Sequence, residues 1–133
     1  MYAYAIVLYS LFIILRYIYA QIKFLEDNHM AKATIEINAQ GSTSTAEKLL
    51  EHIDFSGIQE VIIQKLTWHD GGPADVTYVF EAFTITVHEG FGVGYGGTGP
   101  SGLVHHLLKI GFSKENAERV YTYHGQEPLV LVP

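Results

Sequence analysis

The first 25 residues are much more apolar than the rest of the chain, and this contrast divides the sequence into two unlike parts. Residues 1–15 are apolar or aromatic except for Ser10, and five of the nine tyrosines occur within the first 19 positions. Residues 2–25 are enough to cross a bilayer, with tyrosines near the membrane interfaces and Arg16 as the main unfavourable residue. A secretory signal is disfavoured, because no basic residue precedes the apolar run and no small-residue cleavage site follows it.

The residues before Met30 suggest a different origin for this segment. Residues 25–30 can be encoded as TTG GAG GAT AAT CAT ATG, which places the ribosome-binding string GGAGG eight nucleotides before an ATG. We therefore expect the biological protein to begin at Met30 and to have 133 − 29 = 104 residues, with residues 1–29 read from untranslated upstream DNA. The alternative is that residues 1–29 are translated and anchor the protein in a membrane.

Composition excludes several kinds of function. The chain has no cysteine, so disulfides, thiolate nucleophiles and cysteine-ligated zinc sites are impossible. Its formal net charge is −6, whereas sequence-independent DNA binding needs several lysines or arginines, so we expect no DNA partner. The length of residues 30–133 fits one domain.

The pattern of apolar residues beyond residue 30 predicts several strands. Residues 33–38 alternate in polarity, as in a short half-buried strand. Residues 58–68 and one long strand over 76–89 are expected to pair as an antiparallel hairpin around a turn at 69–73. A last strand is expected within residues 121–132.

Two or three short helices accompany these strands. A capping box at residues 44–47 starts the first helix, which we expect to end near Ser56. The second has Pro100 in its first turn and ends at Gly111, and the third begins with Ser113 as its N-cap. This order predicts an α+β fold, in which an antiparallel sheet is covered by the helices and preceded by the apolar N-terminal segment.

A glycine-rich run is the best candidate for a binding site. Residues 90–99 contain six of the thirteen glycines and lead into the predicted second helix. Free backbone N–H groups and the positive end of a helix dipole favour a phosphate there, and Phe91 and Tyr95 offer rings for base stacking. The alternative is a glycine-rich turn in which both rings are ordinary packing residues. The predicted ligand-binding residues are Phe91, Tyr95, Gly96, Gly97, Thr98, Gly99, Ser101 and Arg119.

Arg119 belongs to this set because it is the sole arginine beyond the apolar segment. An arginine in a chain of negative net charge is a candidate for bidentate phosphate contact. The alternative is a surface ion pair with Glu115, four residues earlier on the same helix.

Other kinds of site find little support. The glycines match G-x-G-x-x-G, but no βαβ unit or downstream acidic residue accompanies them, and no Walker A sequence is present. The seven histidines lack chelating spacing, since His105 and His106 are adjacent on a helix, so we predict no metal site. We predict no catalytic residues and no cofactor.

Residues 94–103, Gly-Tyr-Gly-Gly-Thr-Gly-Pro-Ser-Gly-Leu, follow a long strand and precede a short helix and an arginine-bearing helix. In this order and in overall size the chain resembles the phage anti-Thoeris proteins of the first-described type, over roughly residues 58–121. The resemblance implies a cyclic ADP-ribose sponge of the host cytoplasm. Such a protein sequesters, uncleaved, the nucleotide signals of bacterial TIR-domain enzymes, and so inhibits anti-phage defence. It also implies a homo-oligomer with the ligand near subunit interfaces.

The resemblance also assigns roles to particular residues. It implies that Phe91 stacks on adenine, that the turn at residues 98–101 contacts the pyrophosphate or ribose, and that Arg119 contacts a phosphate. The family is expected to use two arginines where this chain offers one, which leaves the second phosphate contact unassigned.

Two other classes of function stay open. A small nucleotide-processing enzyme would use the same loop, with His105, His106 or Glu89 as acid or base. A membrane-anchored interaction protein would need residues 1–29 to be translated and would bind a protein partner through its domain.

Overall fold

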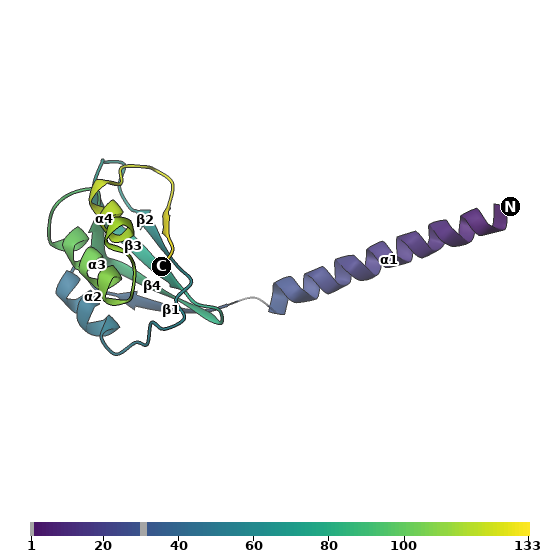
Figure 1. Cartoon of the computed structure of the whole chain (residues 1–133), viewed down its shortest axis with the longest axis horizontal. Helices are drawn as coiled ribbons and strands as arrows, with labels where there is room; N and C mark the ends of the chain where they lie inside the picture. Colours follow the sequence, from purple (N-terminus) through teal and green to yellow (C-terminus); the bar gives the residue numbers. More distant parts are fainter. Residues whose placement is uncertain (1, 30–31) are drawn as a thin grey trace. The chain divides into compact units, whose positions relative to one another are not determined.

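The chain forms two units, residues 1–31 and residues 32–133 (Figure 1). A computed structural model describes residues 2–29 and 32–133, with side chains for residues 2–23 and 32–133. The predicted translation start at Met30 lies outside the described residues.

The N-terminal unit is a single helix, α1 (Tyr2–His29). Its segment Tyr2–Lys23 has 22 residues and is apolar enough to cross a membrane by length and composition. At 1.5 Å per residue this segment is about 33 Å long, close to the thickness of the hydrocarbon core of a bilayer. The same test is passed by signal sequences, so the membrane anchor and the upstream extension both stay predictions.

The second unit is built on a five-stranded sheet in the order β1-β4-β3-β2-β5. The strands are β1 (Ala33–Asn38), β2 (Glu60–Lys65), β3 (Gly72–Val79), β4 (Phe83–Val93) and β5 (Leu129–Leu131). All neighbours are antiparallel except β1 and β4, which are parallel. The predicted α+β class is confirmed, but the sheet is mixed and only mostly antiparallel.

The long strand predicted over residues 76–89 is two strands joined by a tight turn. The N–H of Phe80 donates to the carbonyl oxygen of Phe83 at 2.9 Å, and their rings stack with centroids 4.5 Å apart. Glu81 and Ala82 at the tip are exposed. Because this turn contains no glycine or proline, the usual sequence signal for a turn is absent. The predicted hairpin is nevertheless confirmed, since β2 and β3 pair antiparallel.

Three helices pack on one face of the sheet: α2 (Thr43–Leu50), α3 (Thr98–Lys109) and α4 (Lys114–Thr122) (Figure 1). The predicted Ser113 cap is confirmed, because its Oγ accepts the N–H of Asn116 at 3.2 Å. The predicted capping box at residues 44–47 is wrong by two residues. The N-cap is Ser42, whose Oγ accepts the N–H of Thr45 at 3.1 Å, and the helix ends at Leu50 rather than near Ser56.

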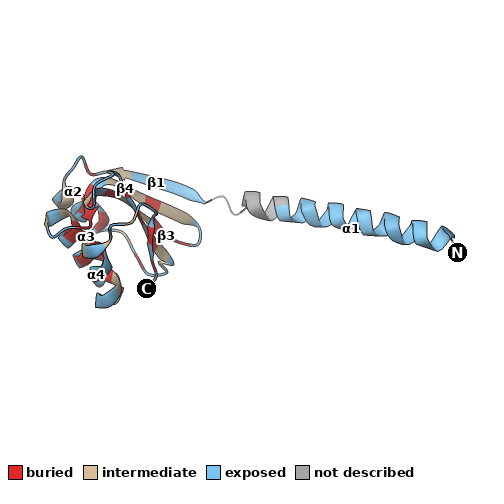
Figure 2. Ribbon diagram, turned by 90° about the horizontal axis from the view of Figure 1, so that it is seen from above, coloured by how far each residue is buried: buried red, intermediate tan, exposed pale blue. Residues whose placement is uncertain are grey.

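The core lies between the sheet and these helices, and β1 at the edge is mostly exposed (Figure 2). Side chains alternate along the strands, so that Val76 and Tyr78 are fully buried under the helices whereas Thr77 lies on the open face. The largest fully buried side chains are Tyr78, Leu50, Ile63, Ile85, Leu103, Leu107, Leu131, Val61, Val76, Val87, Val93 and Val120.

Candidate functional site

An irregularity in β4 sets the position of the glycine-rich run. Val76 pairs with Val87 and Ala74 with Phe91, so three residues of β4 face the single residue Asp75. One of the three, Glu89, has a φ of 56°, in the left-handed region that non-glycine residues rarely occupy. The bulge shifts the pairing register between β3 and β4 by two residues. Gly90, just after it, packs against α2, where an added Cβ would lie 2.6 Å from that of Ala46.

Backbone groups of two other segments contact the loop after β4. Gly94 has a φ of 80°, and its N–H donates to the carbonyl oxygen of Val120 at 2.7 Å. A Cβ on Gly94 would collide with the carbonyl oxygens of Asp70 and Tyr123. Glycine is therefore required here by packing as well as by its conformation.

Several other glycines in the run make room for the ring of Tyr95. A Cβ added to Gly92, Gly97 or Gly99 would lie 2.8, 2.7 or 2.9 Å from an atom of that side chain. Tyr95 still keeps 42% of its surface exposed, and a Cβ on Gly96 would meet nothing within 4 Å. The glycine content thus serves largely to seat one half-exposed aromatic ring.

The start of α3 is the most polar part of this region. Its N-cap, Gly97, supplies no side-chain hydrogen bond, and Pro100 has no N–H to offer. The N–H groups of Thr98 and Gly99 have no hydrogen-bond partner among the described residues. Together with the helix dipole, these two donors favour an acceptor or an anion.

Two grooves, each of about 620 Å³, adjoin this helix start. Both are lined by Thr43 and Thr98, and the Oγ1 of Thr43 donates to the carbonyl oxygen of Gly90 at 2.7 Å. The first groove is lined by Gly41, Thr43, Leu66, Pro73, Glu89, Gly90, Phe91, Tyr95, Thr98 and Gly99. The second is lined by Thr43, Ser44, Glu47, Gly97, Thr98, Ser101, Gly102 and His105.

The charges in these grooves are negative. Glu89 lines the first and Glu47 the second, and no lysine or arginine of the described residues lines either. A carboxylate suits sugar hydroxyls, which donate to it, but repels a phosphate. The two grooves of one chain are therefore suited to the sugar and base of a nucleotide better than to its phosphates.

The structure brings most of the predicted site residues to the grooves, but Phe91 is buried beside the first groove and Arg119 lies elsewhere. Tyr95, Gly97, Thr98, Gly99 and Ser101 all line the grooves, and Gly96 lies between them in the chain. Each of these residues lies in the loop between β4 and α3 or in the first turn of α3.

Phe91 and Arg119 do not take the predicted positions. Phe91 has only 3% of its surface exposed and stacks against the ring of His106 inside the core, so its ring has no free face for adenine. Arg119 is exposed on α4 and lines neither groove. The alternative, an ion pair with Glu115, is not found among the described residues either, where α4 pairs Lys114 with Glu118 at 3.8 Å.

Thr43 and Glu47 are site residues that the sequence did not reveal. Both belong to α2, and they reach the grooves because α2 packs beside β4 and α3. In the sequence, Glu47 fits only the predicted capping box at residues 44–47, and Thr43 has no predicted role. The hydrogen bond from Thr43 to Gly90 spans 47 positions, so nothing local in the sequence could have indicated it.

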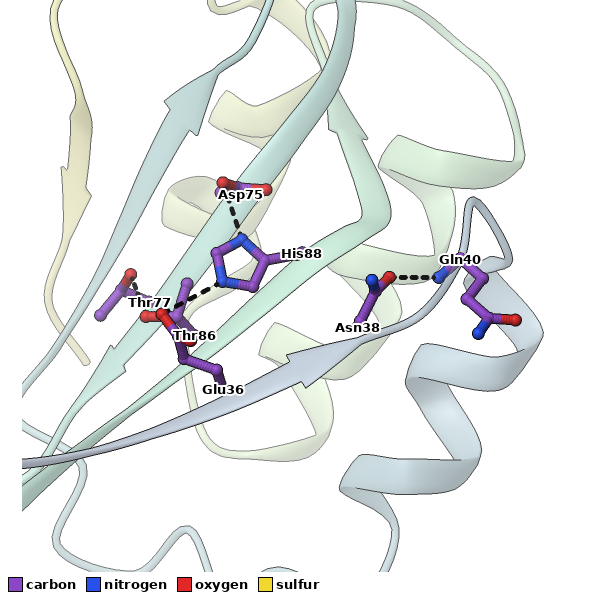
Figure 3. Close-up of polar contacts among 7 residues, drawn as sticks. All are labelled: Glu36, Asn38, Gln40, Asp75, Thr77, Thr86 and His88. Atoms are coloured by element: carbon purple, nitrogen blue, oxygen red, sulfur yellow. Dashed lines mark hydrogen bonds and ion pairs between the residues drawn. The ribbon is translucent and has the colours of Figure 1, made fainter.

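A second polar cluster, on the open face of the sheet, was also missed (Figure 3). His88 on β4 places Nδ1 3.0 Å from Oδ2 of Asp75 on β3, and Nε2 3.6 Å from Oε1 of Glu36 on β1. The hydrogen bond to Asp75 raises the pKa of His88 above its usual value. Nearby, the hydroxyls of Thr77 and Thr86 join β3 to β4 at 2.9 Å.

This cluster links three strands without offering evident chemistry. His88 has carboxylates on both ring nitrogens, which leaves neither nitrogen free to activate a hydroxyl. The described residues contain no group of three or more side chains that could hold a metal ion. We therefore interpret the cluster as structural, with His88 stabilising the edge strand β1 on β4 through its contact with Glu36.

Comparison of the chain with family models, with curated proteins and with solved structures finds no match. The resemblance to anti-Thoeris proteins therefore rests on the residues quoted for it.

Proposed function

We propose that residues 30–133 form a non-catalytic binding domain that sequesters a nucleotide of the cyclic ADP-ribose type. In this role the protein would inhibit TIR-based anti-phage defence in the host cytoplasm. The observation that carries the proposal is the uncapped start of α3, where the N–H groups of Thr98 and Gly99 have no partner among the described residues and the first groove is bordered by the half-exposed Tyr95.

The described residues support a different arrangement from the one expected from the sequence. Tyr95 replaces Phe91 as the stacking ring, because it is exposed whereas Phe91 is buried. The carboxylates of Glu89 and Glu47 would accept from ribose hydroxyls, and the N–H groups of Thr98 and Gly99 would contact the pyrophosphate.

The missing positive charge points to a second subunit. A pyrophosphate carries two negative charges, and neither groove is lined by a cationic side chain of the described residues. Arg119 lies exposed on α4, so in a homo-oligomer it is available to a groove of a neighbouring copy. The proposed site is thus complete only in an oligomer.

Calorimetric titration of residues 30–133 with cyclic ADP-ribose isomers tests the proposal. After titration the mixture is heat-denatured and the released nucleotide analysed. Tight binding with intact nucleotide recovered is the expected result, and altered nucleotide would identify an enzyme instead. Absence of binding by the folded domain would overturn the proposal and leave the glycine run as a packing device.

Matched variants localise the binding. Tyr95→Ala is expected to weaken binding at least tenfold. Trp68→Ala is the control, because Trp68 is 90% exposed and lines neither groove, so it should bind as tightly as the unmodified domain. Arg119→Ala should weaken binding and also reduce the oligomer that sedimentation detects with ligand present.

One observation favours the enzyme alternative. Glu89 combines a left-handed backbone with a place in the groove wall, and strained residues cluster at catalytic sites. Turnover of the bound nucleotide, abolished by Glu89→Gln, would establish that alternative.

The membrane-anchored alternative depends on α1. Its segment Tyr2–Lys23 satisfies the length and composition of a membrane span. Membrane fractionation of the native product tests it, because a soluble product without peptides from residues 2–20 would exclude an anchor.

A further inference from the structure

A cavity of about 650 Å³ between α2 and α3 has a buried histidine in its wall. His106 on α3 is only 7% exposed, and Phe55 packs edge-on to it with ring centroids 4.8 Å apart. Leu50, Ile53 and Ile110 add apolar surface. A volume of this size is typical of sites for small organic ligands.

The hydrogen bond on the buried side of His106 determines where its proton lies. Nδ1 lies 2.9 Å from the hydroxyl of Tyr78, which is fully buried and has no other partner among the described residues. If Nδ1 carried the proton, the phenolic O–H would be left buried without an acceptor, which is costly. The phenol therefore donates to Nδ1, and the proton of the neutral ring is on Nε2.

Because Nδ1 is bonded to Tyr78, Nε2 is the ring nitrogen of His106 that is left to reach the cavity. Nε2 has no hydrogen-bond partner in the described part of the chain. It is nevertheless not among the side-chain atoms that are both fully buried and unpaired there, of which Asp75 Oδ1 is the one found. Nε2 must therefore have some accessible surface, and the cavity is what His106 lines. The imidazole of His106 thus places a donor beside the apolar and aromatic part of the wall, which Leu50, Phe55 and Ile110 form.

Charged groups at the same cavity restrict the ligand further. Glu47, Glu51 and Asp54 contribute three carboxylates against two lysines, Lys48 and Lys109, and none of these five forms an ion pair within the described residues. An anionic ligand would meet this negative excess, whereas a simple ammonium ion would leave the Nε2–H unused. A neutral amide avoids the repulsion and also uses the Nε2–H, because its carbonyl oxygen accepts from Nε2 and its N–H groups donate to a carboxylate.

We propose that the cavity between α2 and α3 binds a neutral aromatic amide, with its carbonyl oxygen on Nε2 of His106 and its ring against Phe55. This site adjoins that of the proposed function: His106 and Phe55 line neither groove, whereas Ser44, Glu47 and His105 are shared with the second.

Benzamide is the probe that tests the proposal on the full chain in a non-ionic detergent. Long-range proton–nitrogen spectra at pH 7 should show His106 as the neutral Nε2–H tautomer. Benzamide should then shift its Nε2 resonance saturably, with benzoate binding at least tenfold more weakly. A charged ring, an Nδ1–H tautomer, or no saturable shift up to the solubility limit of benzamide would overturn the proposal.

Two variants test whether benzamide binding depends on the buried His106. His106→Phe keeps an aromatic ring but removes the donor, so benzamide affinity should fall at least tenfold in a variant that remains folded by circular dichroism. His69→Phe is the matched control, because His69 is exposed and lines none of the described cavities, and its affinity should not change. If His106→Phe does not fold, the difference in affinity between benzamide and benzoate for the unmodified chain tests the proposal, and equal affinities would overturn it.

Discussion

The hydroxyl of Tyr78 on β3 lies 2.9 Å from Nδ1 of His106 on α3, and the two form a buried polar pair within an apolar core. Burial raises the pKa of Tyr78 far above its ordinary value, so the phenol stays protonated and able to donate. This hydrogen bond connects α3 to β3 of the sheet and orients the imidazole of His106 at the cavity wall.

Removing this phenol should destabilise the domain. Tyr78→Phe leaves Nδ1 of His106 without a partner in the core, which should lower the free energy of unfolding by about 1–3 kcal/mol. Urea denaturation at pH 7 measures the loss. Tyr121→Phe is the control, since its hydroxyl makes only an exposed contact of 3.4 Å to Ser101, and a similar loss there would contradict the argument.

His106 should make the domain sensitive to acid. Burial first, and then the charges of Lys109 and His105, lower its pKa to about 4. The unfolded chain, with an ordinary pKa near 6.5, binds the proton more readily, so this contribution is present above pH 6.5 and is lost as the pH falls towards 4. The full difference corresponds to about 3 kcal/mol.

Denaturation curves from pH 4 to 7 measure this effect. The stability of His106→Phe should fall less than that of the unmodified protein across this range, whatever its stability at pH 7. Equal slopes for the two proteins would contradict the buried, neutral state of His106.

His88 should act in the opposite direction. Its pKa is raised by hydrogen bonding to Asp75, so its stabilising contribution is present below the ordinary pKa near 6.5 and is lost as the pH rises through the raised value. The side chain is about one-third exposed, so solvent screening limits the effect to less than about 1 kcal/mol. Hydrogen exchange of β1 should therefore quicken above pH 6.5 beyond its intrinsic pH dependence, and His88→Asn should remove that excess.

Two neighbouring glycines should respond very differently to alanine. Gly94→Ala places a Cβ against two backbone carbonyls at a φ of 80°, so we expect a loss of at least about 2 kcal/mol in unfolding free energy. Gly96→Ala meets nothing within 4 Å and should change stability by no more than about 0.5 kcal/mol. Thermal denaturation of both variants provides the comparison.

The two aromatic residues of the glycine run should separate stability from binding. Phe91→Ala opens a cavity in the core and should cost about 3–5 kcal/mol. Tyr95→Ala should lower stability by less than about 1.5 kcal/mol while weakening nucleotide binding, because its ring is half exposed. Calorimetry and urea denaturation of the same preparations measure both effects. Loss of nucleotide binding without loss of stability in Phe91→Ala would instead show that Phe91 contacts the ligand.

Local signals in the sequence determined several elements. Ser113 caps α4, Pro100 lies in the first turn of α3 and residues 33–38 form β1, because capping, proline geometry and side-chain alternation act within a few residues. The turn at residues 80–83 escaped prediction because stacked rings and one backbone bond stabilise it in place of glycine or proline.

The sequence by itself determined the division into an apolar segment and an α+β domain, and it located the glycine-rich entry into α3. Only the tertiary structure decided that Phe91 is buried while Tyr95 is exposed, that Thr43 and Glu47 join the grooves, and that Tyr78 meets His106. The physical reason is distance along the chain. Burial and hydrogen bonding depend on which segments pack together, and the bonds from Thr43 to Gly90 and from Tyr78 to His106 join positions 47 and 28 residues apart.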